Sequence, residues 1–138
     1  MRAGAGGSDI RLQLLAPVRV HQGEPVRFTL RIVNAGDRPA TVYLQGRPPA
    51  FDVTVHDASG RQVWRRLEAA TVAMVLGIRE LALGEWLEFE DSWRQLEAAG
   101  GPVPPGRYRL TGLLPGEPGR TLRSRPTPLE ILPSSRAV

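Results

Sequence analysis

Strict alternation of apolar and polar residues is the main pattern along this chain. Between Val26 and Ile32 every second residue is apolar, and the residues between them are arginine or threonine. The same period recurs at 10–14 and 51–56, and with one interruption at 87–93. A period of two is that of a β-strand with one buried face. The pattern therefore predicts a chain built from half-buried strands.

Shorter apolar runs between turn residues predict further strands. The 13 prolines and 15 glycines are scattered between these runs rather than gathered in one tract, as expected for many short strands joined by turns. Residues 67–79 have apolar residues at mixed spacing, which leaves a helical turn open, although we favour an irregular connection. The predicted strands, about seven to nine in number, cover 10–14, 26–32, 40–44, 51–55, 63–64, 78–83, 87–93, 107–110 and 127–132.

The order of these elements predicts the fold class. Strands linked by short turns must each bury one face, and two stacked sheets satisfy that requirement. We therefore expect an all-β antiparallel β-sandwich over residues 9–133, as a single domain. The Gly/Ala-rich segment 1–8 is expected to be disordered and residues 134–138 to form a frayed tail.

Alternation also assigns the faces of the strands. If the strands at 87–93 and 107–110 pair, Glu88 and Glu90 face Arg107 and Arg109 across the ladder. The residues expected to be largely buried are Phe28, Leu30, Ile32, Phe51, Val53, Val55, Trp64, Leu87, Phe89, Trp93, Tyr108 and Leu110.

The charge of the chain at first suggests nucleic-acid binding, because all 18 basic residues are arginine and the net charge is +4. However, the arginines occur singly, apart from the pair Arg65–Arg66, and no nucleic-acid-binding motif accompanies them. We interpret the arginine bias as codon usage of a GC-rich genome and expect no nucleic-acid partner. The N-terminus lacks a signal-peptide apolar region and no apolar stretch is long enough to span a membrane, so we expect a cytoplasmic protein without membrane contact.

The inventory of reactive side chains argues against an enzyme. The chain has no cysteine and two histidines, His21 and His56, neither with a nucleophile placed beside it. Glu88, Glu90 and Asp91 form an acidic cluster, but alternation sends Asp91 to the other face of the strand, so they cannot converge on one cation. We therefore expect no catalytic residue, no metal site and no cofactor.

An ordered set of short motifs between residues 28 and 113 resembles a known family. The motifs are FTLRIVN, AFDVTVHD, SGRQVW, LALGE and PGRYRLTG, with Phe89 four residues before Trp93. Together they resemble the BsuPI-type intracellular proteinase inhibitor family of bacteria, which implies an immunoglobulin-like β-sandwich and binding to a proteinase. Leu83 departs from the family pattern, which usually has proline there. The matching positions are Asn34, Asp52, Gly60, Trp64, Leu81, Leu83, Gly84, Glu85, Phe89, Trp93, Gly106 and Tyr108.

Most matching positions have a structural explanation. We expect Trp64 and Trp93 to fill the core and Asn34 to form a turn. Tyr108, two residues after a glycine, resembles the tyrosine corner of immunoglobulin-like sandwiches. Asp52 is either a solvated residue of a strand face or the cap of a neighbouring loop amide.

Two proline-containing loops are candidate recognition surfaces, because proline lowers the entropy lost on binding. We expect Arg94–Gly106, together with a nearby exposed Trp86, to be the main surface, and Gln45–Ala50 a secondary one. Replacing 95–103 with a Gly-Ser linker is expected to leave the melting temperature almost unchanged. The candidate partner-binding residues are Trp86, Arg94, Gln95, Pro102, Pro104, Pro105, Arg47 and Pro48.

The sequence therefore predicts a protein-binding module. The first hypothesis is an inhibitor-like protein whose partner is a protein such as a serine proteinase. The alternative is an accessory module that mediates assembly, for example as a homodimer through an open sheet edge or through the Trp86 face.

Overall fold

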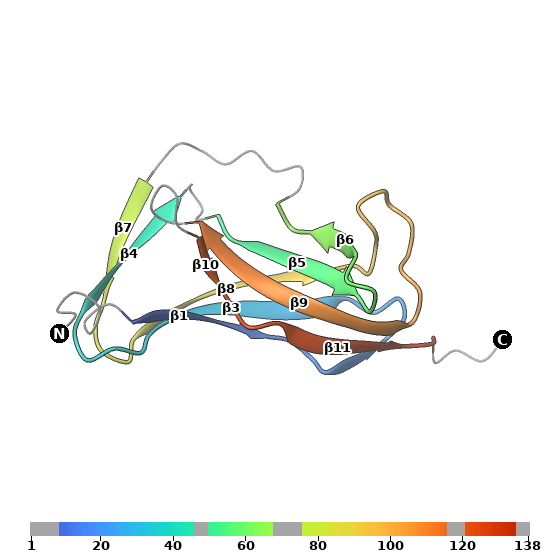
Figure 1. Cartoon of the computed structure of the whole chain (residues 1–138), viewed down its shortest axis with the longest axis horizontal. Coiled ribbons are helices and arrows are strands. Elements are labelled where there is room, and N and C mark those ends of the chain that lie inside the picture. Colours follow the sequence, from blue (N-terminus) through green and yellow to red (C-terminus); the bar gives the residue numbers. More distant parts are fainter. Residues whose placement is uncertain (1–8, 46–49, 68–75, 116–120, 135–138) are drawn as a thin grey trace.

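The computed structural model of the chain describes residues 9–45, 50–67, 76–115 and 121–134. The predicted disorder of 1–8, and the predicted tail beyond Ser134, lie outside these residues. All regular elements in the described ranges are strands (Figure 1). They are β1 (Ile10–Leu15), β2 (Arg19–His21), β3 (Val26–Asn34), β4 (Ala40–Gln45), β5 (Asp52–Asp57), β6 (Gln62–Arg65), β7 (Leu76–Leu81), β8 (Trp86–Trp93), β9 (Gly106–Pro115), β10 (Thr121–Arg123) and β11 (Thr127–Leu132).

The strands form the predicted immunoglobulin-like β-sandwich. One sheet has the order β1-β3-β8, and the larger one has the order β2-β11-β9-β5-β6, with β10 also paired to β9. A third, two-stranded ribbon consists of β4 and β7. All pairs are antiparallel except β2 with β11, which run parallel. The additional strands relative to the sequence expectation are β2 and β10, each three residues long.

The core lies between the two larger sheets and follows the predicted alternation. The four apolar residues of β3 from Val26 to Ile32 are fully buried, as are Val53, Val55 and Leu110 of the facing sheet. Trp64, Leu87 and Phe89 were also predicted to be buried but are only partly so. They lie on β6 and β8, which are edge strands, and an edge strand has no neighbour to cover its outer flank.

Aromatic rings fill one end of this core. Trp93, 1% exposed, stacks on Trp64 at a centroid distance of 5.9 Å and meets the edge of Tyr108 at 6.0 Å. Phe51 stacks on Phe89 at 5.5 Å, which joins the edge strand β8 to the opposite sheet. Such pairs stabilise a core beyond the area they bury.

The strands β8 and β9, whose pairing the sequence left open, do not pair. β8 pairs with β3, so Glu88 lies opposite Arg31 and forms an ion pair with it at 2.7 Å. β9 lies in the other sheet, between β5 and β11. The long segment between β8 and β9 crosses from one sheet to the other. A connection of that length does not require the two strands that it joins to pair as a hairpin.

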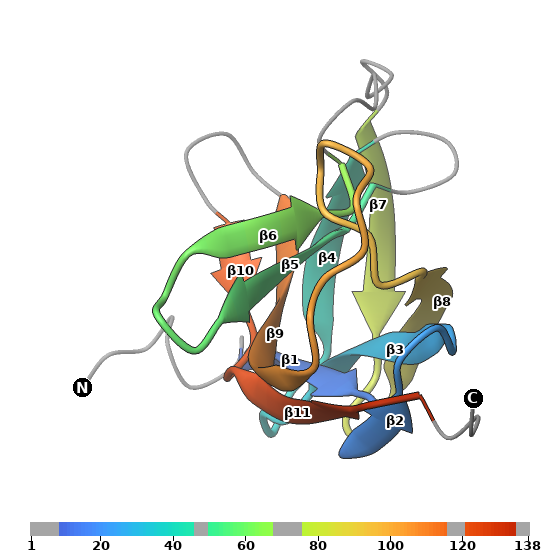
Figure 2. The same ribbon diagram turned by 90° about the vertical axis from the view of Figure 1, so that its right-hand side faces the viewer.

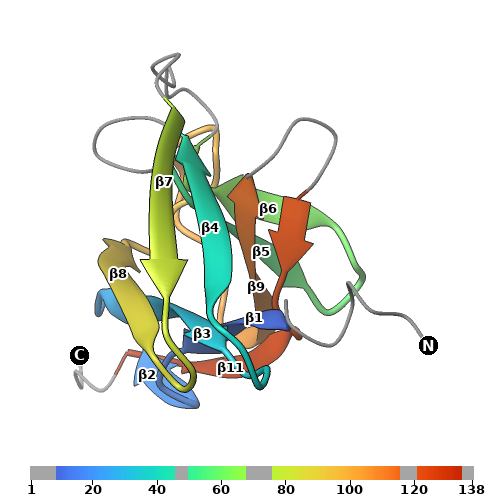
Figure 3. The same ribbon diagram turned by 90° about the vertical axis from the view of Figure 1, so that its left-hand side faces the viewer.

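The β4–β7 ribbon stands away from the β3–β8 pair at a sharp bend (Figure 3). β3 continues into β4 through one turn, and β7 continues into β8 through another that contains Gly84 at φ 75°. Asn34, fully buried, joins the two turns, because its Nδ2 donates to the carbonyl oxygens of Arg38 (2.7 Å) and Leu81 (3.1 Å). Its Oδ1 accepts from the N–H of Gly36 at 3.0 Å. The predicted turn-forming role of Asn34 is confirmed.

The core assignment makes a prediction about stability. Trp93→Ala should lower the free energy of unfolding by about 3–5 kcal/mol, because it leaves a cavity among closely packed rings. Glu88→Ala should lower it by less than about 1 kcal/mol, because the pair with Arg31 is partly solvated. Chemical denaturation followed by circular dichroism measures both values. Equal effects of the two substitutions would contradict the assignment of faces.

Candidate functional site

The β8–β9 loop, residues 94–105, is the longest described connection and lies at the end of the sandwich opposite the β4–β7 ribbon (Figures 1 and 2). The β2–β3 turn, residues 22–25, lies at the same end, and so does the β5–β6 turn, residues 58–61. The loop is hydrogen-bonded to the β2–β3 turn and to β6, as described below, and its Glu97 is ion-paired with Arg61 of the β5–β6 turn at 3.5 Å. It is therefore attached to both sheets.

The base of the loop is fixed by Gln95. Its side chain is 2% exposed. Nε2 donates to the carbonyl oxygens of His21 (2.9 Å) and Glu24 (2.7 Å), and Oε1 accepts from the N–H of Gly23 at 3.3 Å. Gln95 is also the non-glycine residue with a positive φ, 61°, in the described chain, a conformation that ordinary residues adopt only when their surroundings enforce it. The buried amide thus holds the β2–β3 turn against the loop.

Further contacts brace the two limbs of the loop. The Nε1–H of Trp93 donates to the carbonyl oxygen of Leu96 at 2.9 Å, which ties the ascending limb to the aromatic cluster. The N–H of Val103 donates to the carbonyl oxygen of Gln95 at 3.0 Å. Val103 itself is 1% exposed and belongs to the core. A β-bridge between Leu96 and Pro102 completes a small internal hairpin.

The tip of this hairpin is a tight turn around Gly100, which has φ 101°. The N–H of Glu97 donates to the carbonyl oxygen of Gly101 at 2.7 Å, and the N–H of Ala98 donates to the carbonyl oxygen of Val63 on β6 at 3.0 Å. The side chains of residues 98–101 are nevertheless exposed. The loop therefore presents small side chains on a backbone that is hydrogen-bonded to its neighbours.

The descending limb is fixed by the predicted tyrosine corner. The hydroxyl of Tyr108 donates to the carbonyl oxygen of Pro104, four residues upstream. Burial raises the pKa of Tyr108 above its ordinary value, and the carboxylates of Asp57 and Glu97 raise it further. The phenol therefore stays protonated at neutral pH and remains a donor.

A hollow of about 320 Å³ lies at the base of the loop. Leu96, Pro102 and Val103 line it together with Gln22 and Arg94. Arg94 and Pro102 are exposed, so a side chain from another protein can reach both. The hollow offers apolar contact beside one positive charge.

The predicted partner-binding residues differ in whether they are exposed or buried. Arg94, Pro102, Pro104 and Pro105 are exposed on the β8–β9 loop, whereas Gln95 is buried and structural, so its predicted contact with a partner is not supported. Because Gln95 and Val103 belong to the domain interior, replacing 95–103 with a Gly-Ser linker would remove buried contacts, and we now expect it to lower the melting temperature. Arg47 and Pro48 lie outside the described residues.

Trp86 is exposed as predicted, by 51%, but it does not lie near the loop. It begins β8, whereas Arg94 follows the last residue of the strand, so about 25 Å separates them. The guanidinium of Arg31 lies 5.0 Å from the centroid of the Trp86 ring and covers part of one face.

Asp52 acts as a cap, which decides between the two alternatives left open for it. It is buried, and Oδ1 accepts from the N–H groups of Val53 (2.9 Å) and Leu67 (3.0 Å). Its other oxygen is ion-paired with Arg65. Nothing in the sequence distinguished this buried carboxylate from an exposed one, because its position on the polar face of β5 is that of a solvated residue.

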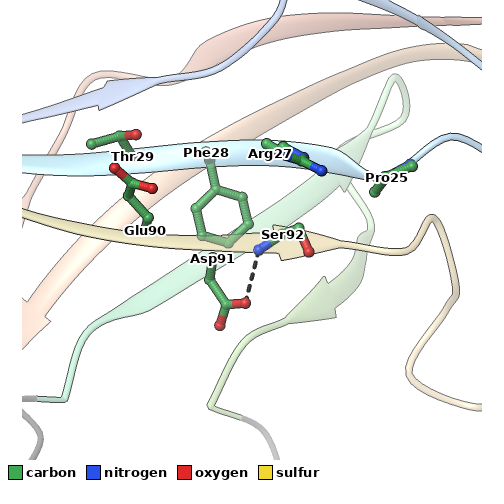
Figure 4. A pocket seen from close by; sticks show the side chains of 7 residues that line it. All are labelled: Pro25, Arg27, Phe28, Thr29, Glu90, Asp91 and Ser92. Atoms are coloured by element: carbon green, nitrogen blue, oxygen red, sulfur yellow. Dashed lines mark hydrogen bonds between the residues drawn. The ribbon is translucent and has the colours of Figure 1, made fainter.

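A second, shallower depression of about 380 Å³ lies along β3 and β8, between Pro25 and Ser92 (Figure 4). Glu90 and Asp91 point to opposite sides of the strand there, as alternation predicts. Among the described residues no group of three or more histidine, aspartate or glutamate side chains is arranged to hold a metal ion. Nor does this part of the chain contain a helix long and apolar enough to cross a membrane.

Comparisons with known proteins place the chain in context. A family model described as BsuPI, intracellular proteinase inhibitor, matches residues 15–119. None of the curated proteins matches the chain significantly. Among solved structures, dimeric latent PorU from Porphyromonas gingivalis is similar with a TM-score of 0.50 and 16% identity, over 90% of this chain and 9% of that one. This likeness concerns the fold alone.

Two further solved structures are less similar. A β-glucosidase from Listeria innocua in complex with glucose has a TM-score of 0.48 and 15% identity, over 91% of this chain and 16% of its own. The CARDB domain of a Pyrococcus furiosus protein has a TM-score of 0.46 and 12% identity, over 92% of this chain and 96% of its own. This chain thus spans only a small part of PorU and of the glucosidase.

The buried amide at the base of the loop makes a prediction. Gln95→Ala should lower the free energy of unfolding by about 2–4 kcal/mol, because it removes a buried side chain and its three hydrogen bonds to the β2–β3 turn. Gln13→Ala on the exposed face of β1 is the matched control and should change it by less than about 0.5 kcal/mol. Urea denaturation provides the comparison. A Gln95 variant as stable as the Gln13 variant would show that the loop is not fixed by this side chain.

Proposed function

Since the chain belongs to the BsuPI family of intracellular proteinase inhibitors, we propose that it inhibits a proteinase by direct binding through its β8–β9 loop. The family is one of inhibitors and not of enzymes. The observation that carries the proposal is the combination of an exposed tip, residues 98–101, with a buried and hydrogen-bonded base.

Bracing of this kind favours binding to a proteinase cleft. An inhibitor loop must be held in one conformation before it binds, because each segment ordered on binding costs free energy. Small inhibitors often use disulfides for this purpose, and this chain has no cysteine. Gln95, Val103 and the Tyr108–Pro104 hydrogen bond take that role here.

The surface of the loop suggests which of its parts contact the cleft of the proteinase and which contact the rim of the cleft. The tip carries Ala98, Ala99, Gly100 and Gly101, small residues that fit a narrow cleft. The hollow beside Arg94 then lies against the rim of the cleft and receives a side chain of the proteinase. A serine proteinase is the partner class we propose, and the cytoplasm is the proposed location, supported by the family's description as intracellular.

Assembly through a separate surface is the alternative. The exposed ring of Trp86 favours it, since an exposed tryptophan is more common at interfaces than elsewhere on a surface. Ile78 and Leu83, exposed by 66% and 54%, lie on β7 and on the turn before Trp86. A homodimer through this region would leave the β8–β9 loop free. Measurement of the mass in solution separates the two functions.

The proposal is tested by incubating the protein with a panel of bacterial serine proteinases at near-stoichiometric ratios. Residual activity should fall to near zero for at least one of them. Ala99→Trp should raise the inhibition constant for that proteinase by about 100-fold or more, because a bulky side chain at the tip blocks entry into the cleft of the proteinase. Ala82→Trp, in the exposed β7–β8 turn at the other end of the molecule, is the matched control and should leave the constant unchanged.

Two results would overturn the proposal. One is a stable oligomer that inhibits no proteinase of the panel, which would favour the assembly function. The other is inhibition that is equally strong with Ala99→Trp, which would place the contact outside the loop. Melting temperatures of both variants should match that of the parent protein, because both alanines are exposed.

A further inference from the structure

The outer face of the larger sheet carries a row of arginines. Arg107 and Arg109 point outward from β9, since Tyr108 and Leu110 between and after them are buried. Arg123 of β10 lies opposite Leu113, which is on the same outward face of β9. Arg107 and Arg109 are two residues apart on one strand, which places them about 7 Å apart. Arg123 lies on the neighbouring strand β10, level with Leu113, which is four residues beyond Arg109 on β9. We call these three residues the arginine row.

No carboxylate of the described residues forms an ion pair with this row, although Glu130 lies directly opposite Arg107 in the β9–β11 register. Arg107, Arg109 and Arg123 are exposed and form no ion pair or hydrogen bond in the described structure. The nearest acidic residues on this face have other partners, because Glu130 is paired with Arg19 at 3.3 Å and Asp52 with Arg65. Glu88 and Glu90, which would face Arg107 and Arg109 if β8 paired with β9, lie in the other sheet. The row thus keeps a net positive charge.

The cross-strand neighbours of the row are of mixed kind: Glu130 lies opposite Arg107, Pro128 and His56 lie opposite Arg109, and Leu113 lies opposite Arg123. Thr111 follows Arg109 on the same face of β9, and Thr54 lies opposite Thr111 on β5. Both threonines are buried, so their short side chains do not project as far from the sheet as the exposed arginines do. The spacing of Arg107 and Arg109 on β9 suits an extended segment, whose alternate side chains also repeat at about 7 Å.

The chemistry of this strip favours a carboxylate-rich polypeptide over a nucleic acid. Arginine forms bidentate hydrogen bonds with carboxylates and is suited to recognise them. Proteins that bind single-stranded nucleic acid add aromatic side chains on which the bases stack. The aromatic residues of this sheet, Trp64 and Tyr108, belong instead to the ring cluster around Trp93 in the core. We infer that the outer face of the larger sheet is a second binding surface, for an acidic segment of a partner protein.

This surface is separate from the proposed inhibitory loop, so its test does not need a proteinase. Binding of a fluorescent oligoglutamate peptide is measured by anisotropy at low and at physiological ionic strength. The double variant R107E/R109E should weaken binding by about tenfold or more. The double variant R27E/R79E is the matched control, because Arg27 and Arg79 are exposed on other strands and their replacement changes the net charge equally. It should weaken binding by less than about twofold.

Three outcomes would overturn the inference. Equal weakening by the two double variants would mean that only the net charge matters. Absence of binding by the parent protein at low ionic strength would show that the arginine row does not bind an acidic segment. Tighter binding of a DNA oligonucleotide of the same charge, lost in R107E/R109E, would make it a nucleic-acid surface instead. Thermal melts followed by circular dichroism verify that each variant is folded. If R107E/R109E does not fold, R107Q/R109Q takes its place.

Discussion

The side-chain amide of Gln95 joins the base of the β8–β9 loop to the β2–β3 turn, and the arrangement of this end of the molecule depends on it. One buried side chain satisfies two carbonyl oxygens and one N–H of a turn distant in sequence. A buried polar group without a partner costs more free energy than a single hydrogen bond contributes, so loop and turn must stay together. The exposed tip at 98–101 is carried by this junction.

The opposite end of the sandwich is held in the same way. Asn34 is buried where β3 turns into β4, and its amide joins that turn to the one between β7 and β8. A chain without cysteine has no covalent means of fixing long connections, and buried amides fix direction as well as distance because they are both donors and acceptors. Between the two junctions the core packs one sheet against the other, and the ring cluster around Trp93 lies at the end that carries the loop.

The parts of the structure that could be predicted from the sequence are those that depend on local periodicity. Alternation is a property of each strand by itself, so the faces of β3, β5 and β9 and the burial of Trp93 followed from it. The partner of a strand depends on the other strands, and for that reason the alternation within β8 does not show that it pairs with β3. The role of Gln95 could not be predicted, because an amide looks the same in sequence whether it is exposed or buried. Val103, an apolar residue between prolines, was the signal that the loop is packed.

Amide hydrogen exchange at the base of the loop tests the account most directly. The N–H of Gly23 donates to the side-chain Oε1 of Gln95, and the N–H of Val103 donates to the backbone carbonyl oxygen of Gln95. If Gln95 fixes the loop, both amides should exchange as slowly as the amides of the paired strands β3 and β9, because they open only when the domain unfolds. Exchange of Gly23 and Val103 near the rate of an unprotected amide, with the strands still protected, would contradict the account.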